Sequence, residues 1–87
     1  MLERKYGMTI EVDIHGMRCA EAKRQLELLL SRTGKDITEI VVIHGCHGGT
    51  ALLEMVRKEL HHPRIKSKYL GLNNGQTTLV LKKPGEK

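Results

Sequence analysis

Two stretches of the sequence end an apolar run with the same three residues, Ile-His-Gly. The first is VDIHG at 12–16, and the second opens VVIHGCHGGT at 41–50. An imidazole can transfer a proton or, when charged, contact an anion, and a glycine lets backbone N–H groups approach an anion closely. Asp13, two residues before His15, could orient that ring or bind a cation. These residue types predict an anion site, of the kind that holds phosphate, around His15, His44 and the glycines at 45, 48 and 49.

Two other interpretations of these motifs stay open. Glycines after a strand can simply form a tight turn, and a histidine there can serve only to hydrogen-bond a loop carbonyl. Two histidines at one place, together with Asp13, favour a site over that interpretation. A metal-binding protein using His15, His44, Cys46 and His47 is a weaker alternative, because adjacent Cys46 and His47 hardly face one ion together. Cys19 and Cys46 belong to no CxxC pair, so reduced thiols are expected.

The spacing of the apolar residues predicts the elements that must position these motifs. Residues 8–15 alternate as a strand does, and 19–32 have helical spacing that ends before Gly34, where glycine suits a C-terminal cap. The run at 38–44 is apolar on both faces, which is typical of an interior parallel strand. A second helix is expected near 50–61 and ends before Pro63. Strands at 65–71 and 76–83 follow, joined by a turn at 73–75 into a hairpin.

This order, β-α-β-α-β-β, predicts a single domain over 1–87 with its core at about 8–82. Crossover connections make the first three strands parallel, and the fourth runs antiparallel. The expected fold class is α/β, more fully an α+β two-layer sandwich with a four-stranded mixed sheet and two helices on one face. Parallel strands end at the same edge, so His15 and His44 should meet there, each before a helix N-terminus. We expect their rings, with Gly48, to lie close enough to share one anion.

The composition favours a polyanionic partner without identifying it. The chain has 87 residues, a net charge of +5 and a pI near 9.5. With no Trp or Phe and only two tyrosines, an aromatic platform for stacking bases is not expected. No run has the length of a membrane span or the pattern of a secretion signal, so a cytoplasmic protein without membrane contact is predicted, with a monomer favoured. His61 and His62, at the end of the second helix, are interpreted as structural.

The two Ile-His-Gly stretches also resemble a known family. VDIHG resembles the LDLHG motif of the small MutS-related (Smr) domain, and VVIHGCHGG resembles its second motif, a strand ending in His-Gly before a basic residue and spaced glycines. The likeness covers about residues 8–82. It implies a fold resembling the C-terminal domain of a bacterial translation initiation factor. It also implies DNA or RNA binding, because members of the family bind nucleic acid and several are nicking or RNA-cleaving endonucleases.

The second motif departs from the family pattern. The family has Lys or Arg soon after His-Gly and then Gly-x-Gly, whereas this chain has Cys46-His47-Gly48-Gly49-Thr50. If Cys46 is an insertion, His47 takes the basic position and Thr50 replaces the last glycine, and the following helix stays in phase. Without an insertion, Cys46 replaces the basic residue. In both alignments a permanently charged phosphate contact is missing, because histidine is largely neutral at pH 7.

The resemblance carries specific roles over to this chain. Catalysis falls to Asp13, His15 and His44, with a histidine as general acid or base and Asp13 orienting it or holding a divalent cation, Mg²⁺ or Mn²⁺. Phosphate binding falls to the glycines and neighbours of the two motifs, namely Gly16, Gly45, His47, Gly48, Gly49 and Thr50. Basic side chains on predicted outer faces add to that surface, with Lys66 and Lys68 assigned to phosphate and Lys23, Arg24 and Arg64 beside them.

These assignments predict a nucleic-acid-binding domain with weak endonuclease activity where the two motifs meet. The alternative is a non-catalytic DNA- or RNA-binding module in repair, recombination or RNA metabolism. Arg18 stands where the family often has a Thr N-cap, so the first helix is expected to begin less firmly.

Overall fold

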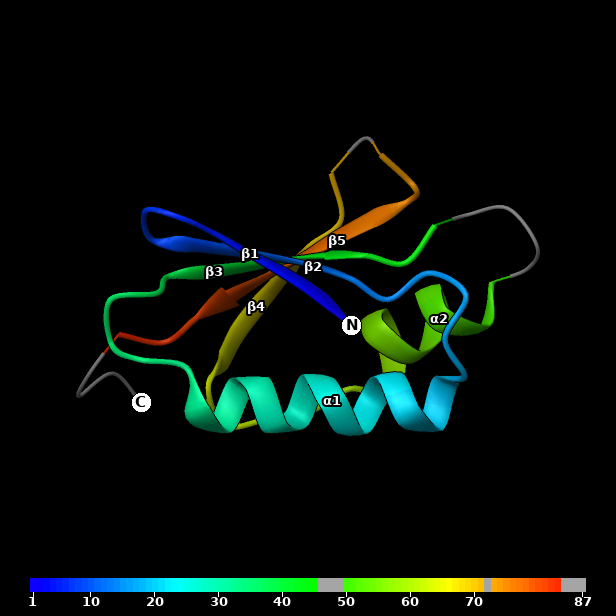
Figure 1. Cartoon of the computed structure of the whole chain (residues 1–87), viewed down its shortest axis with the longest axis horizontal. Coiled ribbons are helices and arrows are strands. Elements are labelled where there is room, and N and C mark those ends of the chain that lie inside the picture. The colour runs from blue at the N-terminus through cyan, green and yellow to red at the C-terminus, as the bar shows by residue number, and fades with distance from the viewer. Residues whose placement is uncertain (46–49, 72, 84–87) are drawn as a thin grey trace.

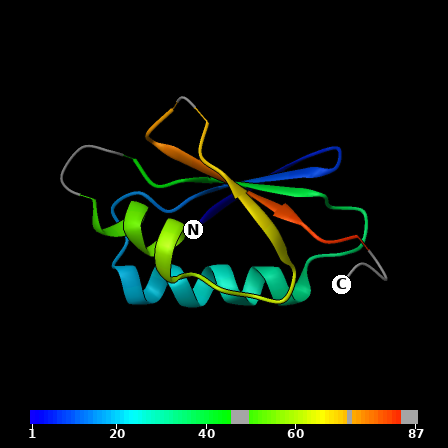
Figure 2. The ribbon, with the colours of Figure 1, turned by 180° about the vertical axis from the view of Figure 1, so that it is seen from behind.

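The protein is a five-stranded sheet with its helices on one side. The computed structural model describes residues 1–45, 50–71 and 73–83. The strand order is β1-β2-β3-β5-β4, and Figures 1 and 2 show α1 and α2 beneath the same face of the sheet, with the opposite face uncovered. The two-layer α/β architecture expected from the sequence is therefore confirmed. None of the helices in the described ranges is long and apolar enough to cross a membrane.

The sheet has one strand more than the four that the sequence predicted. β1 (Leu2–Tyr6) pairs antiparallel with β2 (Thr9–Asp13), and the hairpin between them turns at Gly7, whose φ is +57°. Glycine with positive φ at the first central position is the pattern of a type II′ hairpin turn. All five β1 residues are exposed, so no alternation of apolar and polar residues marks the strand in the sequence.

β2 and β3 (Glu39–Ile43) are parallel neighbours joined by α1 (Cys19–Arg32), as predicted. The crossover buries one face of the helix against the inward residues of both strands. The C-terminal cap of α1 differs from the prediction, because Gly34 does not adopt a left-handed conformation. Instead Thr33 closes the helix, and both its backbone N–H and its hydroxyl donate to the Leu29 carbonyl oxygen.

The second helix is shorter and wound differently from the expected 50–61. α2 (Ala51–Glu54) is a single α-helical turn, and it continues as the π-helical turn η1 (Met55–Glu59). The Leu60 N–H closes η1 by donating to the Met55 carbonyl oxygen, five residues back, at 2.8 Å. This wider winding places Met55 in the core beside Val56 and Leu60.

The final hairpin is inserted so that β5 (Gln76–Leu81) lies between β3 and β4 (Ile65–Tyr69). β5 is antiparallel to both neighbours, so β4 runs in the same direction as β2 and β3. The predicted directions of the strands are confirmed. A register shift between Ile65 and Ser67 leaves Lys66 outside the regular pairing.

The core lies between the sheet and the helices and is entirely aliphatic apart from one methionine. Its buried members come from every layer: Val12, Ile14, Ala22, Leu26, Leu29, Leu30, Ile37, Ile40, Val42, Met55, Val56, Leu60, Leu79 and Leu81. β2 and β3 are held by this core up to their last residues, so the segments that follow them, which carry His15 and His44, start from a rigid edge. We call this edge, formed by Asp13–Gly16 and Ile43–Gly45, the rim.

Candidate nucleic-acid interface

The first Ile-His-Gly forms a tight turn that holds His15 outside the sheet. The Met17 N–H donates to the Ile14 carbonyl oxygen at 3.0 Å, and Gly16, the third residue of the turn, has φ +80°. This is the pattern of a type II turn, which requires positive φ at its third residue and so favours glycine. The Ile14 N–H in turn donates to the Ile43 carbonyl oxygen at 2.9 Å, which fixes the turn beside the end of β3.

Asp13 and His15 form a hydrogen-bonded pair at the rim. Asp13 Oδ1 accepts from His15 Nδ1 at 2.5 Å and from the His15 backbone N–H at 3.1 Å. Partial burial raises the pKa of Asp13, but the hydrogen bonds from the His15 ring and backbone outweigh it, so the pKa lies below its ordinary value. The His15 side chain is 71% exposed. With Nδ1 donating to a carboxylate, Nε2 of His15 is left toward solvent as a proton acceptor.

The second Ile-His-Gly places its histidine inside the protein. His44 is only 4% exposed. Its Nδ1–H donates to the Gly45 carbonyl oxygen, and its Nε2 lies 2.9 Å from the hydroxyl oxygen of Thr77. Arg57 Nε donates to that same hydroxyl oxygen at 2.8 Å, which leaves the hydroxyl proton of Thr77 for His44 Nε2. Burial is the largest cause and lowers the pKa of His44, the hydrogen bond to Gly45 partly offsets it, and the Arg57 cation lowers the pKa further, so the ring is held neutral.

The two motifs are therefore neighbours at the rim, but their histidine rings are not arranged as expected. A Cβ added to Gly45, whose φ is +75°, would lie 3.7 Å from the Cβ of His15, so the motifs are neighbours. Both nitrogens of His44 are engaged inside the protein, however, so the prediction that the two rings share one anion is wrong. Gly48, the third residue of that prediction, lies outside the described residues.

β1 contributes a residue to this surface that sequence reasoning missed. Arg4 lines a hollow of about 90 Å³ on the uncovered face, beside Asp13 and Glu11. Its positive charge is one of the causes that lower the pKa of Asp13. The signal that could have found it is Gly7, a turn residue placed between two short segments of equal length, but β1 has no apolar face to mark it as a strand.

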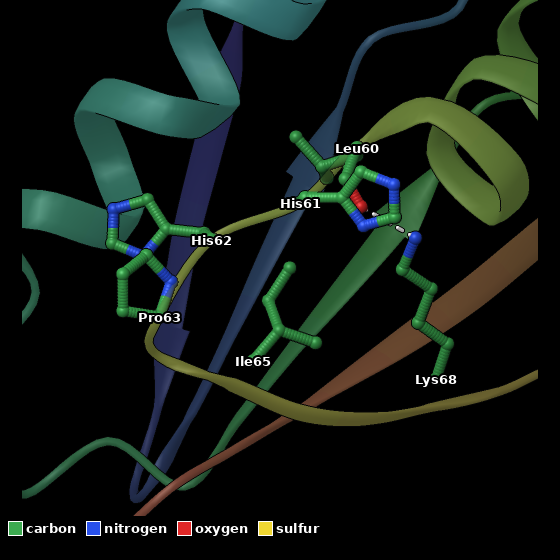
Figure 3. A pocket seen from close by; sticks show the side chains of 6 residues that line it. All are labelled: Leu60, His61, His62, Pro63, Ile65 and Lys68. Atoms are coloured by element: carbon green, nitrogen blue, oxygen red, sulfur yellow. Dashed lines mark hydrogen bonds between the residues drawn. The ribbon is translucent and has the colours of Figure 1, made fainter.

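Lys68, which the sequence assigned to phosphate binding, is engaged elsewhere. Its ammonium donates to the Leu60 carbonyl oxygen at 2.6 Å and to the Arg57 carbonyl oxygen at 3.3 Å, at the C-terminal end of η1. Figure 3 shows the first of these bonds, at the edge of a hollow of about 340 Å³ that His61 and His62 also line. Burial lowers the pKa of Lys68. Lys68 therefore caps a helix end and is not part of the rim.

The other predicted phosphate contacts are dispersed or lie outside the described residues. Lys66 is near the start of β4, at the end of the sheet opposite the rim. Arg64 donates to the Thr33 carbonyl oxygen at 2.6 Å. The Thr50 hydroxyl donates to the Glu54 carboxylate at 3.4 Å. The remaining assigned residues, His47, Gly48 and Gly49, and also Cys46, belong to the part of the chain that is not described.

The fold also bears on the structural role predicted for the histidines at 61 and 62 and on the presence of a metal site. His62 accepts the Arg64 backbone N–H at Nδ1 and donates from Nε2 to the Ser31 hydroxyl at 3.0 Å, so its structural role is confirmed. Among the described residues no group of three or more His, Cys, Asp or Glu side chains could hold a metal ion. Cys19 is a free thiol that packs partly against the core.

The first helix begins next to His15 without a side-chain cap. Arg18 occupies the N-cap position with extended backbone and makes no side-chain hydrogen bond to the helix, which agrees with the expectation for a chain that lacks the family's threonine there. The first N–H groups of α1 thus keep their partial positive charge close to the rim.

Comparisons with known proteins agree with the fold and the motifs. The family model described as the Smr domain matches residues 12–76. The crystal structure of the Smr domain of Thermus thermophilus MutS2 superposes with a TM-score of 0.72 at 26% identity, covering 83% of this chain and 96% of that one. No curated protein matches the chain. With a family model matching most of its length and a solved Smr domain sharing its fold, the chain belongs to the Smr domain family.

Proposed function

We propose that this chain binds nucleic acid through phosphates at the rim and cleaves a phosphodiester bond there, with His15 as the general base. The observation that carries the proposal is the Asp13–His15 pair, in which a carboxylate fixes one ring nitrogen of an exposed histidine and leaves the other to solvent. The His15 ring is 71% exposed and is not among the side chains that form the core.

The pair supports a simple acid–base chemistry. Nε2 of neutral His15 takes the proton from an attacking oxygen, either of water or of a ribose 2′-hydroxyl, as that oxygen bonds to phosphorus. The P–O bond to the leaving oxygen then breaks, and the leaving oxygen takes up a proton from solvent water, to which the imidazolium later returns its own proton. The Asp13 carboxylate stabilises the imidazolium that forms, because its Oδ1 already accepts from Nδ1. A positioned base of this kind accelerates a reaction typically about 10²–10⁴-fold.

Several positive groups around the pair suit a phosphate. Arg4 lies across the hollow from Asp13, Arg18 is exposed at the start of α1, and the uncapped N-terminus of α1 follows directly. Unpaired N–H groups at a helix N-terminus favour anions. His44 acts here as a positioning residue, because its Nδ1–H holds the Gly45 carbonyl and so shapes the rim beside His15.

The second candidate function is nucleic-acid binding without catalysis, and the positive groups around the Asp13–His15 pair support it as well. A protonated His15 beside Asp13 would grip a phosphate without moving a proton. Asp13 and Glu11 line one hollow, but with no third ligand among the described residues the chain offers no preformed cage for Mg²⁺ or Mn²⁺. Divalent cations are therefore varied in the experiment.

The test is binding and cleavage of end-labelled single-stranded RNA, single-stranded DNA and duplex DNA, with EDTA or with added Mg²⁺ or Mn²⁺. Binding should weaken steeply between about 50 and 200 mM salt, because phosphate contacts release counterions. His15→Ala should lower the rate of product formation about 10²–10⁴-fold. His61→Ala is the matched control, since His61 is also exposed but lines a different hollow.

Two results would separate the candidates. Salt-dependent binding without product in any metal condition would leave the non-catalytic module as the function. Affinity that stays flat across the salt range would contradict phosphate binding and with it both candidates.

A further inference from the structure

We propose that a second hollow beside the rim receives an unpaired base of a single-stranded nucleic acid, with Tyr69 as the stacking surface. This inference rests on the proposed function, because it assumes that the phosphate backbone is held at the rim. The hollow has a volume of about 340 Å³ and is lined by Tyr69, Leu70, Gly71, Asn73, Gln76 and Thr78. Pockets that hold small planar ligands begin at about this size.

The tyrosine ring has the Gly71 backbone beside it and is otherwise largely exposed. Gly71 has φ +62°, and a Cβ added there would lie 3.3 Å from Cε2 of Tyr69, so the ring rests beside the Gly71 backbone. Tyr69 is nevertheless 65% exposed. An exposed tyrosine ring offers its face to a flat partner, and every base has a π-face that can stack on it.

The polar lining suits the edge of a base. The Asn73 Oδ1 accepts the Gly75 N–H at 2.7 Å, which leaves the Asn73 amide NH₂ as a donor. Gln76 and Thr78 add an amide and a hydroxyl on the adjacent strand, and each can both donate and accept. Arg57 Nη2 donates to the Gln76 carbonyl oxygen at 3.1 Å, which holds the backbone of this wall. Unpaired bases are recognised by this combination of stacking and side-chain hydrogen bonds.

The hollow is connected to the rim through the sheet. Asp13 is paired with Ile43, and Ile43 with Gln76, so these residues form one row across three strands. The Gly75 carbonyl oxygen accepts the N–H groups of both His44 and Gly45 at 3.0 Å, so the turn that carries Asn73 is bonded directly to the rim. β4 lies three strand spacings from β2, roughly 14 Å. A short single-stranded oligonucleotide spans that distance, with a phosphate at His15 and a base at Tyr69.

This arrangement is one stacking ring and not an aromatic platform. The chain has two tyrosines and no other aromatic side chain except histidine. Tyr6 is 57% exposed and lies at the opposite end of the sheet, paired with Thr9. It therefore provides a matched control of the same type and similar exposure outside the proposed path.

The experiment measures binding of the whole chain to a fluorescent single-stranded oligonucleotide and to the same oligonucleotide with abasic sites. We expect the abasic probe, and the Tyr69→Ala variant with the intact probe, each to weaken binding about tenfold. Tyr69→Phe should keep the affinity, and Tyr6→Ala should not change it. The Tyr69 ring resonances in an NMR titration should shift upfield with the intact probe and not with the abasic one.

The outcomes distinguish this inference from the proposed function. If binding depends on salt and on His15 but not on the bases or on Tyr69, the base site is wrong and the phosphate site stands. If neither probe binds, both are overturned. The wild-type comparison of intact and abasic probes decides the matter even if a Tyr69 variant folds poorly.

Discussion

The two Ile-His-Gly stretches have the same local sequence and opposite surroundings. At the end of β2, His15 is largely exposed and bonded to one carboxylate. At the end of β3, His44 is buried and bonded at both nitrogens. The same three residues thus give a side chain free for chemistry in one place and a structural hydrogen-bonding group in the other.

The difference arises from the neighbours in the sheet. β2 lies next to β1, whose last paired position beside Asp13 is Leu2, so nothing from that strand covers His15. β3 lies next to β5, which presents Thr77 to His44, and Arg57 from η1 completes the network. The ring of His44 therefore finds a partner on the neighbouring strand, whereas the ring partner of His15 is a carboxylate of its own strand. A repeated motif therefore predicts a shared location better than it predicts a shared role.

The largest effect expected from the difference between His15 and His44 is on cleavage. His15→Ala should lower the rate about 10²–10⁴-fold, because it removes the proposed base, while its free energy of unfolding should change by less than about 0.5 kcal/mol, since the side chain is exposed. His44→Gln keeps a donor and an acceptor at the buried position and should retain most of the activity. The measurements are single-turnover cleavage and urea unfolding. An equal loss of cleavage in His44→Gln at unchanged stability would mean that both histidines act in the chemistry.

Much of the fold could be predicted from sequence because buried apolar residues recur along the chain with the period of a helix or a strand. The bounds of α1 were correct, since its inward face is apolar at helical spacing, and the interior position of β3 followed from a run that is apolar on both faces. β1 was missed because all its residues are exposed, so the strand has no periodic pattern of apolar residues. The π-helical winding at Met55–Glu59 depends on how that segment packs against α1 and the sheet, which local spacing does not record.

The candidate site was predictable in its location and only partly in its chemistry. The pair Asp13 and His15 lies within one turn of chain, so the contact follows from local sequence. The ring of His44 is bonded to Thr77, which is distant in sequence and lies nearby because β5 is inserted beside β3, and Arg57 of η1 completes the network. The hydrogen bonds of Lys68 could not be predicted for a similar reason, because the carbonyl groups that it caps belong to the preceding helical segment.

A smaller effect should follow from removing the hydroxyl that ties His44 to the core. Thr77→Val keeps the shape of the side chain but leaves His44 Nε2 and Arg57 Nε without their shared partner. An unsatisfied buried polar group costs about 1–3 kcal/mol, and we expect a loss of that size in urea unfolding. Thr78→Val is the matched control, since Thr78 is the next residue and lies on the uncovered face. If both variants lose the same stability, the network around His44 contributes nothing specific.

The smallest effect is the pH dependence that the buried histidine should confer on stability. Burial, followed by the Arg57 cation, lowers the pKa of His44 in the folded protein below its unfolded value near 6.5. The unfolded chain therefore binds a proton that the folded protein does not, so the stability present above pH 6.5 is lost progressively as the pH falls below it. One proton contributes at most about 1.4 kcal/mol per pH unit. The measurement is urea unfolding of wild type and His44→Gln between about pH 7.5 and 5.5, and the difference between the two proteins isolates the contribution of His44. The variant should lose less stability than wild type over this range, because its side chain takes up no proton on unfolding. Equal slopes in the two proteins would show that His44 is protonated as easily in the fold as in the unfolded chain, and the contrast with His15 would then rest on exposure alone.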